Sequence, residues 1–481
     1  MTLYVGQPPH APVTRKPGLG IVLSLAVALI LFGALGPNLE LTTLASVTLA
    51  TGVFLLWRPG QPPILLYIFL VGWLQASMVV FQATLDGIPV SEFSRYHGDE
   101  ARAVFLTELA VVAMAVGMKL GAGAFKPSFI PALRAAALSL PLRRWFVAYA
   151  ASAAVATAAR LAATHAPGLS QILGGLAALH WAFFFTLAFA FFVRRAYRAP
   201  YFYLAFAWEF MTGIGGYFSD FKVVFIVSLL ALVASGVRIT TRFVALSVAV
   251  AFAGGVVMVA WTAIKPTYRI FVSGGERAQI VTVGYGERVE KLAELAGGLD
   301  GKTMGEGVNT LMRRIGYVDF FSLVLDNVPS VVPHQHGAIT MDAISRPFTP
   351  RILFPGKSVI NDSERTRLFT GVAVAGAEQG ASISIGWPGE LYIDFGAWLM
   401  IPAAVGLGLC FGLVQRFFLH WRWSRGLLGM AVSIALLLGA AAVETSLTKM
   451  LGGLAASFIA AWLVIRFIPR RVRPWWGELR R

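Results

Sequence analysis

The side chains with the clearest capacity for chemistry are a group of cations in the C-terminal third of the chain. They are Arg346, Arg351, Lys357, Arg365 and Arg367. Three prolines lie between Arg346 and Lys357, and they keep the backbone stiff and extended. Arginine binds phosphate with two parallel hydrogen bonds and lysine acts as a point charge, so together they suit a diphosphate. The alternative is that these cations form a solvated run of charge. The flanking Phe348 and Phe354 argue against full solvation of this segment.

Candidate acid–base groups flank these cations. Glu390 precedes a long apolar run, where a carboxylate could take a proton from an acceptor hydroxyl. His334 and His336 are open to three interpretations: metal ligands, acid–base or substrate contact, and a structural role. No carboxylate-rich ligand set accompanies them, so we expect no metal and no other cofactor. Glu378 and Tyr392 are candidates for substrate contact, although Tyr392 could equally belong to an aromatic belt at a membrane surface.

The composition places these residues in a membrane protein. Of 481 residues, 57% are hydrophobic and 13% are charged, whereas a soluble globular protein is about 45–50% apolar and about 25% charged. The apolar runs are about 20 residues long, which suits transmembrane helices rather than the shorter, alternating strands of a β-barrel. A cytosolic enzyme, a secreted domain and a disordered chain are excluded. The single cysteine, Cys410, lies in an apolar run and excludes an internal disulfide.

The apolar runs predict an all-α polytopic protein with about 12 transmembrane helices. We expect spans at 19–36, 40–57, 61–83, 102–123, 145–164, 173–193, 201–218, 221–236, 242–264, 393–415, 427–446 and 449–468. Lysine and arginine concentrate in every second connection and in the tail, which places both termini in the cytoplasm. The net charge of +16 is then explained by topology and by anionic membrane lipids, and we expect no nucleic-acid partner.

The ionisable residues inside the predicted spans lie in the outer half of the membrane or near its middle. They are Glu108, Arg160, His180, Glu209 and Glu444, and Lys222 stands at the outer end of a span. A charge inside the bilayer is costly, so each is either an ion pair that joins helices or part of a functional site. Their one-sided distribution favours a water-filled cavity open to the outer face, with Arg160 and Glu209 as cavity groups.

The organisation has four parts. Residues 1–264 hold nine predicted transmembrane helices, 265–392 form one large outer loop, 393–468 hold three more helices, and 469–481 form a basic cytoplasmic tail. Loops of this length are usually functional. Within the loop, helical spacing of apolar residues predicts helices at 287–299 and 308–328. From Pro329 to Pro388 we expect little regular structure.

A polytopic chain with one large outer loop resembles the Wzy-type, O-antigen-polymerase-like oligosaccharide repeat unit polymerases of bacterial polysaccharide biosynthesis. The resemblance rests on two elements: Pro350-Arg351-Ile-Leu-Phe-Pro355-Gly-Lys357 and Gly389-Glu390-Leu-Tyr392-Ile-Asp394-Phe-Gly396. Lys222 is also similar to a cation that recurs at the outer start of a mid-chain span in such proteins.

The resemblance implies a GT-C-like, metal-independent membrane glycosyltransferase of the bacterial inner membrane, with its large loop in the periplasm. It would transfer a glycan from undecaprenyl diphosphate onto a lipid-linked repeat unit to build O-antigen or exopolysaccharide. Partners would be these lipid-linked oligosaccharides, with a chain-length regulator and a flippase as further candidates. Candidate roles divide as follows: diphosphate binding by Arg346, Arg351, Lys357, Arg365, Arg367 and Lys222; acceptor activation by Glu390 or His336; glycan or cavity contact by His334, Tyr392, Glu378, Arg160 and Glu209.

Three alternatives stay open. A ligase of the same superfamily would move finished glycan onto another acceptor. A transporter or lipid flippase would need a route to both membrane faces, and the chain has neither a visible inverted repeat nor a matching pair of broken spans. A scaffold of an envelope-assembly complex would tolerate loss of the loop cations.

Overall fold

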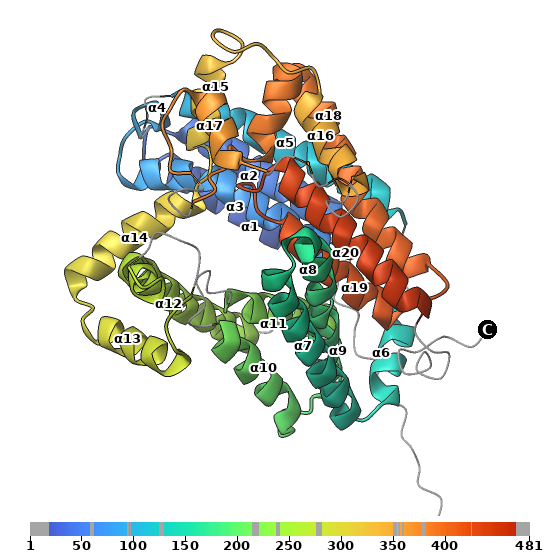
Figure 1. Ribbon diagram of the computed structural model, residues 1–481. Coiled ribbons are helices and arrows are strands. Elements are labelled where there is room, and N and C mark those ends of the chain that lie inside the picture. Colours follow the sequence, from blue (N-terminus) through green and yellow to red (C-terminus); the bar gives the residue numbers. More distant parts are fainter. Residues whose placement is uncertain are drawn as a thin grey trace, which may run out of the picture.

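In the computed structural model of the chain all regular elements are helices, and the residues that it describes include no strand (Figure 1). These residues are 19–57, 62–93, 96, 98–124, 129–213, 221–236, 241–275, 281–349, 354, 356–357, 360–376, 381–424 and 426–467. Arg351, Glu378 and the predicted tail at 469–481 lie outside them.

Seven stretches of helix among these residues are long and apolar enough to cross a membrane. They are α2 (Leu39–Leu56), α3 (Ile64–Leu85), α5 (Glu100–Ala122), α7 (Leu142–His165), the consecutive α8 (Ser170–Ala178) and α9 (His180–Arg194), α18 (Trp387–His420) and α20 (Leu447–Phe467). The other helices before the loop, and one after it, are α1 (Leu19–Gly33), α4 (Val90–Phe93), α6 (Phe129–Ser139), η1 (Pro167–Leu169), α10 (Pro200–Gly213), α11 (Lys222–Ala234), α12 (Thr241–Val272) and α19 (Leu427–Leu437).

Helices lie where the sequence predicts spans, and three predicted edges are wrong. The helix expected to end at 264 continues to Val272, as α12. The span expected at 427–446 stops early, because α19 is followed by a short turn, η4 (Leu438–Ala440), and by a non-helical connection up to α20. The span expected from 393 begins instead at Trp387 and is broken at Gly396, whose φ of 70° favours glycine. Both breaks lie close to the predicted site.

α5 and α18 pack backbone to backbone along a row of glycines. A Cβ on Gly408 would lie 2.0 Å from the carbonyl oxygen of Met114, and one on Gly117 would lie 2.0 Å from that of Val405. Small residues allow this close approach, which is typical of helix pairs in membranes. The contact fixes the part of α18 that follows the break at Gly396 against α5.

The loop is more regular than the sequence predicts. The helix at 287–299 is present as α13 (Tyr285–Gly297), but the one at 308–328 is two helices, α14 (Gly301–Ile315) and α15 (Asp319–Asn327). The chain turns between them because the N–H of Tyr317 donates to the carbonyl of Gln75 on α3, at 3.0 Å.

The expectation of little structure after Pro329 is wrong. The chain forms α16 (Ala338–Ser345), the turn η2 (Arg346–Phe348) and α17 (Asp362–Thr370). Asp394 of α18 stabilises the start of α16, since its carboxylate accepts from the N–H of Ile339 at 3.0 Å and of Thr340 at 2.7 Å. Asn361 caps α17 by accepting from the N–H of Glu364 at 3.1 Å.

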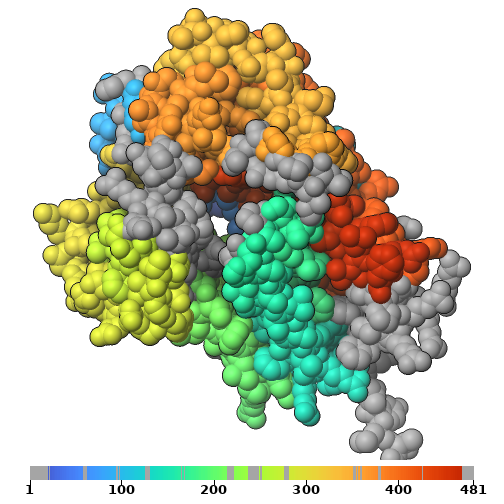
Figure 2. Space-filling model, viewed as in Figure 1, coloured from blue at the N-terminus to red at the C-terminus, as the bar shows by residue number. Residues whose placement is uncertain are grey.

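The space-filling view shows a hollow in the molecule (Figure 2). In this view α7 and α8 border it on one side, and the orange segment that contains α17 lies above it. Atoms of the red C-terminal part and of the blue N-terminal part lie deeper inside. α17, which carries Arg365 and Arg367, therefore stands at the rim of this hollow.

Candidate functional site

A buried ion pair joins α17 to the starts of α18 and α20. The side chain of Glu390 is 1% exposed, and its Oε1 accepts a hydrogen bond from Nη1 of Arg365 at 2.8 Å. Its Oε2 accepts from the backbone N–H of Leu447, the first residue of α20, at 2.6 Å. A single carboxylate therefore fixes one arginine and one helix terminus, and the arginine offsets part of the cost of burying its charge.

A second ion pair lies at the start of α17. Asp362 is 2% exposed, and its Oδ2 is 2.6 Å from Nζ of Lys449 on α20. The same Nζ donates to Oγ of Ser382 at 2.7 Å. The other oxygen of Asp362 is buried and has no hydrogen-bond partner among the described residues. Lys449 is exposed, so this cluster reaches from the interior to the surface.

Arg346 and Lys357, both predicted to bind diphosphate, come together at η2 and are partly engaged in the fold. Nε of Arg346 lies 2.8 Å from a carboxylate oxygen of Asp342. Nζ of Lys357 donates to the carbonyls of Arg346 at 2.6 Å and Thr349 at 2.8 Å. Asp342 is also 3.7 Å from Nη2 of Arg365, so it links these cations to the Glu390 pair.

Arg367, which follows Arg365 by two residues on α17, holds the end of that helix. Its Nε donates to the carbonyl of Val374 at 2.9 Å, which ties the end of α17 to the chain that follows. Its role in diphosphate binding stays a prediction.

The two histidines differ in their surroundings. Nδ1 of His334 is 3.2 Å from the carbonyl of Ile393, and its ring packs edge-on against Tyr392. The hydroxyl of Tyr392 donates to the carbonyl of Val328 at 3.2 Å, deep in the protein. His334 and Tyr392 thus pack at the break in α18. His336 has a left-handed φ of 48° and lies next to Gly337, just before α16.

Cations that sequence analysis did not assign lie on α12 and α14. Lys265 of α12 interacts electrostatically with Arg314 of α14, with Arg269 one turn away, and with Lys222 at the start of α11. Lys265 and Arg269 are half-buried, while Lys222 and Arg314 are exposed. Like charges so close together repel, and an anion among them would relieve that repulsion.

Glu444 lies near Lys265 and is held by α3. It lies in the non-helical connection before α20, is exposed, and interacts electrostatically with Lys265. Its Oε2 accepts from Nε2 of Gln75 at 2.9 Å, and Oε1 of Gln75 accepts from the N–H of Val443 at 2.6 Å. Gln75 thereby holds the connection, and Glu444 with it, against α3.

Tyr317 lies among the carboxylates of the site. Its hydroxyl donates to the carbonyl of Ser384. Burial, and then the negative charges of Glu444 and Asp362, raise the pKa of Tyr317 above its usual value. Tyr317 therefore stays protonated and acts as a hydrogen-bond donor at this position.

The predicted cavity residues Arg160 and Glu209 belong to a separate network. Glu209 of α10 accepts from the hydroxyl of Tyr149 at 2.7 Å and lies 3.4 Å from Nε2 of His180. Arg160, exposed on α7, interacts electrostatically with Glu209. This network joins α7, α9 and α10, and Glu209 is buried in it.

Within the described part of the chain, no group of three or more His, Cys, Asp or Glu residues is placed to hold a metal ion. Comparison with known proteins finds no family model, no curated protein and no solved structure that matches this chain.

Proposed function

We propose that the protein is a membrane glycosyltransferase that polymerises lipid-linked oligosaccharide repeat units. It transfers a glycan from undecaprenyl diphosphate onto a second lipid-linked unit at the periplasmic face of the bacterial inner membrane. The proposal includes about twelve spans in a GT-C-like arrangement, cytoplasmic termini and a periplasmic loop.

The observation that carries the proposal is the gathering of Lys222, Arg269 and Arg314 around Lys265, with the carboxylate of Glu444 also close to Lys265. A lipid diphosphate is a leaving group whose negative charge grows during transfer, and preorganised cations stabilise that charge. A carboxylate within reach of the same cations supports placement of an acceptor next to the diphosphate.

In the proposed step, the bond between the sugar carbon and the diphosphate oxygen breaks, and the diphosphate leaves with the electron pair. A new bond forms between that carbon and an acceptor hydroxyl oxygen, whose proton passes to a carboxylate. Glu444 is exposed, whereas both oxygens of Glu390 are engaged and its side chain is 1% exposed. This geometry favours Glu444 as the proton acceptor and Glu390 as the residue that holds Arg365 and α20 in place.

The test is the size of lipid-linked glycans in a strain that lacks the protein, complemented with variants. We expect single repeat units on the diphosphate lipid without the protein, and long chains with the wild type. Lys265→Gln should lower chain formation at normal protein levels, because it removes the central cation. Lys291→Gln is the matched control, since Lys291 pairs with Glu294 on the loop helix α13.

Three outcomes would contradict the proposal. Long chains that persist on the lipid carrier in the deletion strain would favour the ligase alternative. Units trapped on the cytoplasmic side would favour a transporter. Full activity of Lys265→Gln, Arg269→Gln and Arg314→Gln together would remove the site from the mechanism.

A further inference from the structure

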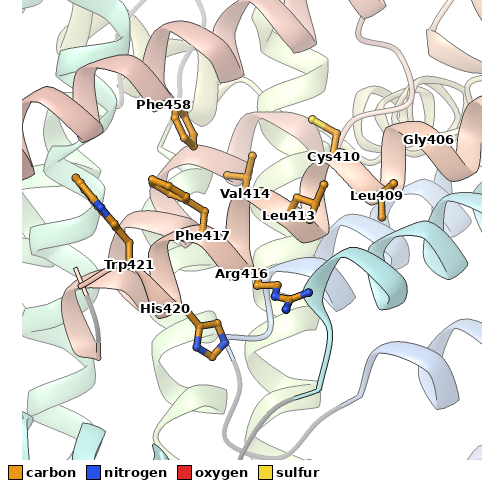
Figure 3. A pocket seen from close by; sticks show the side chains of 10 residues that line it. All are labelled: Gly406, Leu409, Cys410, Leu413, Val414, Arg416, Phe417, His420, Trp421 and Phe458. Carbon is orange, nitrogen blue, oxygen red and sulfur yellow. The ribbon is translucent and has the colours of Figure 1, made fainter. Parts of the chain in front are cut away.

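A groove runs along one face of α18, in the half of the helix that lies away from Glu390. The groove has a volume of about 690 Å³. Residues of α18, the tryptophan that follows the helix and one residue of α20 line it (Figure 3): Gly406, Leu409, Cys410, Leu413, Val414, Arg416, Phe417, His420, Trp421 and Phe458. All but two of these residues are apolar or aromatic. Leu409 and Leu413 are 37% and 47% exposed, so the groove opens to the surroundings of the helix bundle.

The two polar side chains lie together at one end of the groove. Arg416 and His420 are one turn apart on α18, and Figure 3 shows them away from the end at Gly406. Both are exposed. The groove therefore has an apolar length and a cationic end.

Neighbouring residues mark this end as the edge of a membrane. α18 ends at His420, and Trp421 and Trp423 follow, which is typical of the interface between hydrocarbon and water. Arg422 and Arg466 both lie over the ring of Trp423, at 4.8 Å and 4.9 Å from its centre. The surface around the end of the groove is thus rich in positive charge.

The dimensions of the groove match one leaflet. From Gly406 to Arg416 the helix rises about 15 Å at 1.5 Å per residue. Half of the hydrocarbon core of a bilayer is about 15 Å thick. A lipid whose headgroup contacts Arg416 could therefore keep its chain in the groove across its own leaflet.

The glycines of α18 separate the groove from the packed face of the same helix. Gly408 and Gly412 touch the backbone of α5, so a side chain at either would collide with it. A β-carbon on Gly406 would meet no atom of a neighbouring element within 4 Å. Gly406 therefore leaves an open space in the groove that no neighbouring helix fills.

We propose that this groove binds one anionic phospholipid, with an acyl chain along Leu409, Leu413 and Phe417 and the phosphate at Arg416 and His420. The apolar lining suits an acyl chain of the lipid, and the cationic end suits the negative charge of its headgroup. The site lies at the opposite end of α18 from Glu390 and does not depend on the proposed transfer reaction.

The test is native mass spectrometry of the full chain in detergent, with phosphatidylglycerol and phosphatidylcholine that carry the same acyl chains. The wild type should retain phosphatidylglycerol preferentially. Arg416→Gln should weaken phosphatidylglycerol binding about fivefold, because one basic residue near a membrane surface contributes about that factor. Gly406→Phe should fill the groove and weaken binding of both lipids.

Two variants serve as matched controls. Arg422→Gln removes a cation from the same helix end but not from the groove. Gly20→Phe makes the same substitution on α1, where a side chain also has open space. Arg422→Gln should weaken phosphatidylglycerol binding less than Arg416→Gln does, and Gly20→Phe should bind lipid like the wild type. Every variant should elute as the wild type does in size-exclusion chromatography.

Four results would overturn the proposal. The wild type could retain the two lipids equally, or Arg422→Gln and Arg416→Gln could lose phosphatidylglycerol binding to the same extent. Gly406→Phe could leave lipid binding unchanged, or it could dissociate a dimer of the wild type. The last would mean that a second copy of the chain covers the groove.

Discussion

Replacement of Glu390 by glutamine tests how the site is held together. Glutamine keeps the volume of the side chain and removes its charge. Its NH₂ group must then face either Arg365 or the N–H of Leu447, and both are donors. One hydrogen bond is therefore lost whichever way the amide turns, and the guanidinium of Arg365 loses its nearest anion.

The expected loss of folding free energy is about 3 kcal/mol, at the low end of the range for breaking a buried ion pair. The low end applies because Arg365 is 21% exposed and lies 3.7 Å from Asp342, which can take over part of the pairing. The paired variant Arg365→Met/Glu390→Gln removes both charges of the pair and keeps an amide oxygen as acceptor for the N–H of Leu447, so it should be more stable than Glu390→Gln alone.

The assay is unfolding by sodium dodecyl sulfate in mixed micelles, followed by circular dichroism. Lys291→Gln is the control, because the Lys291–Glu294 pair has side chains 24% and 64% exposed, and its loss should change stability by less than about 1 kcal/mol. A Glu390→Gln protein as stable as this control, or a paired variant as unstable as the single one, would refute the argument.

Three further predictions concern other contacts. Lys449→Met should destabilise the protein by about 3 kcal/mol in the same assay, because Asp362, 2% exposed, keeps a buried charge without its partner at 2.6 Å; stability equal to the wild type would contradict this. Gly408→Ala should cost about 1–3 kcal/mol, since its β-carbon would meet the Met114 carbonyl at 2.0 Å, and unchanged unfolding would show that α5 and α18 can move apart. Burial, and then a neighbouring carboxylate, raise the pKa of Asp326 on α15. The free energy of unfolding should therefore fall as pH rises from about 4 through the raised pKa, because the unfolded chain loses its proton first. Asp326→Asn should make this pH dependence flatter when unfolding midpoints are compared from acidic to neutral pH.

The sequence by itself determined the class of protein and the position of its membrane helices. Hydrophobic segregation depends on the local run of residues, so α2, α3 and α5 fall where the runs lie. A local signal for α17 was also present, since Asn361 stands three residues before Glu364 in a capping pattern. Hydrophobic periodicity could not detect this helix, because few of its residues are apolar.

Only the tertiary structure decided which ionisable groups meet. The start of α16 is capped by Asp394, far along the chain, and Glu444 is held by Gln75 from the N-terminal half. Arg365 could be identified as a cation from the sequence, but its pairing with Glu390 depends on how α17 packs beside α18 and α20. A hydrophobic run acts on its own neighbours, whereas a charge in a site acts on whichever groups the packed helices bring within a few ångströms, and no local pattern encodes that distance.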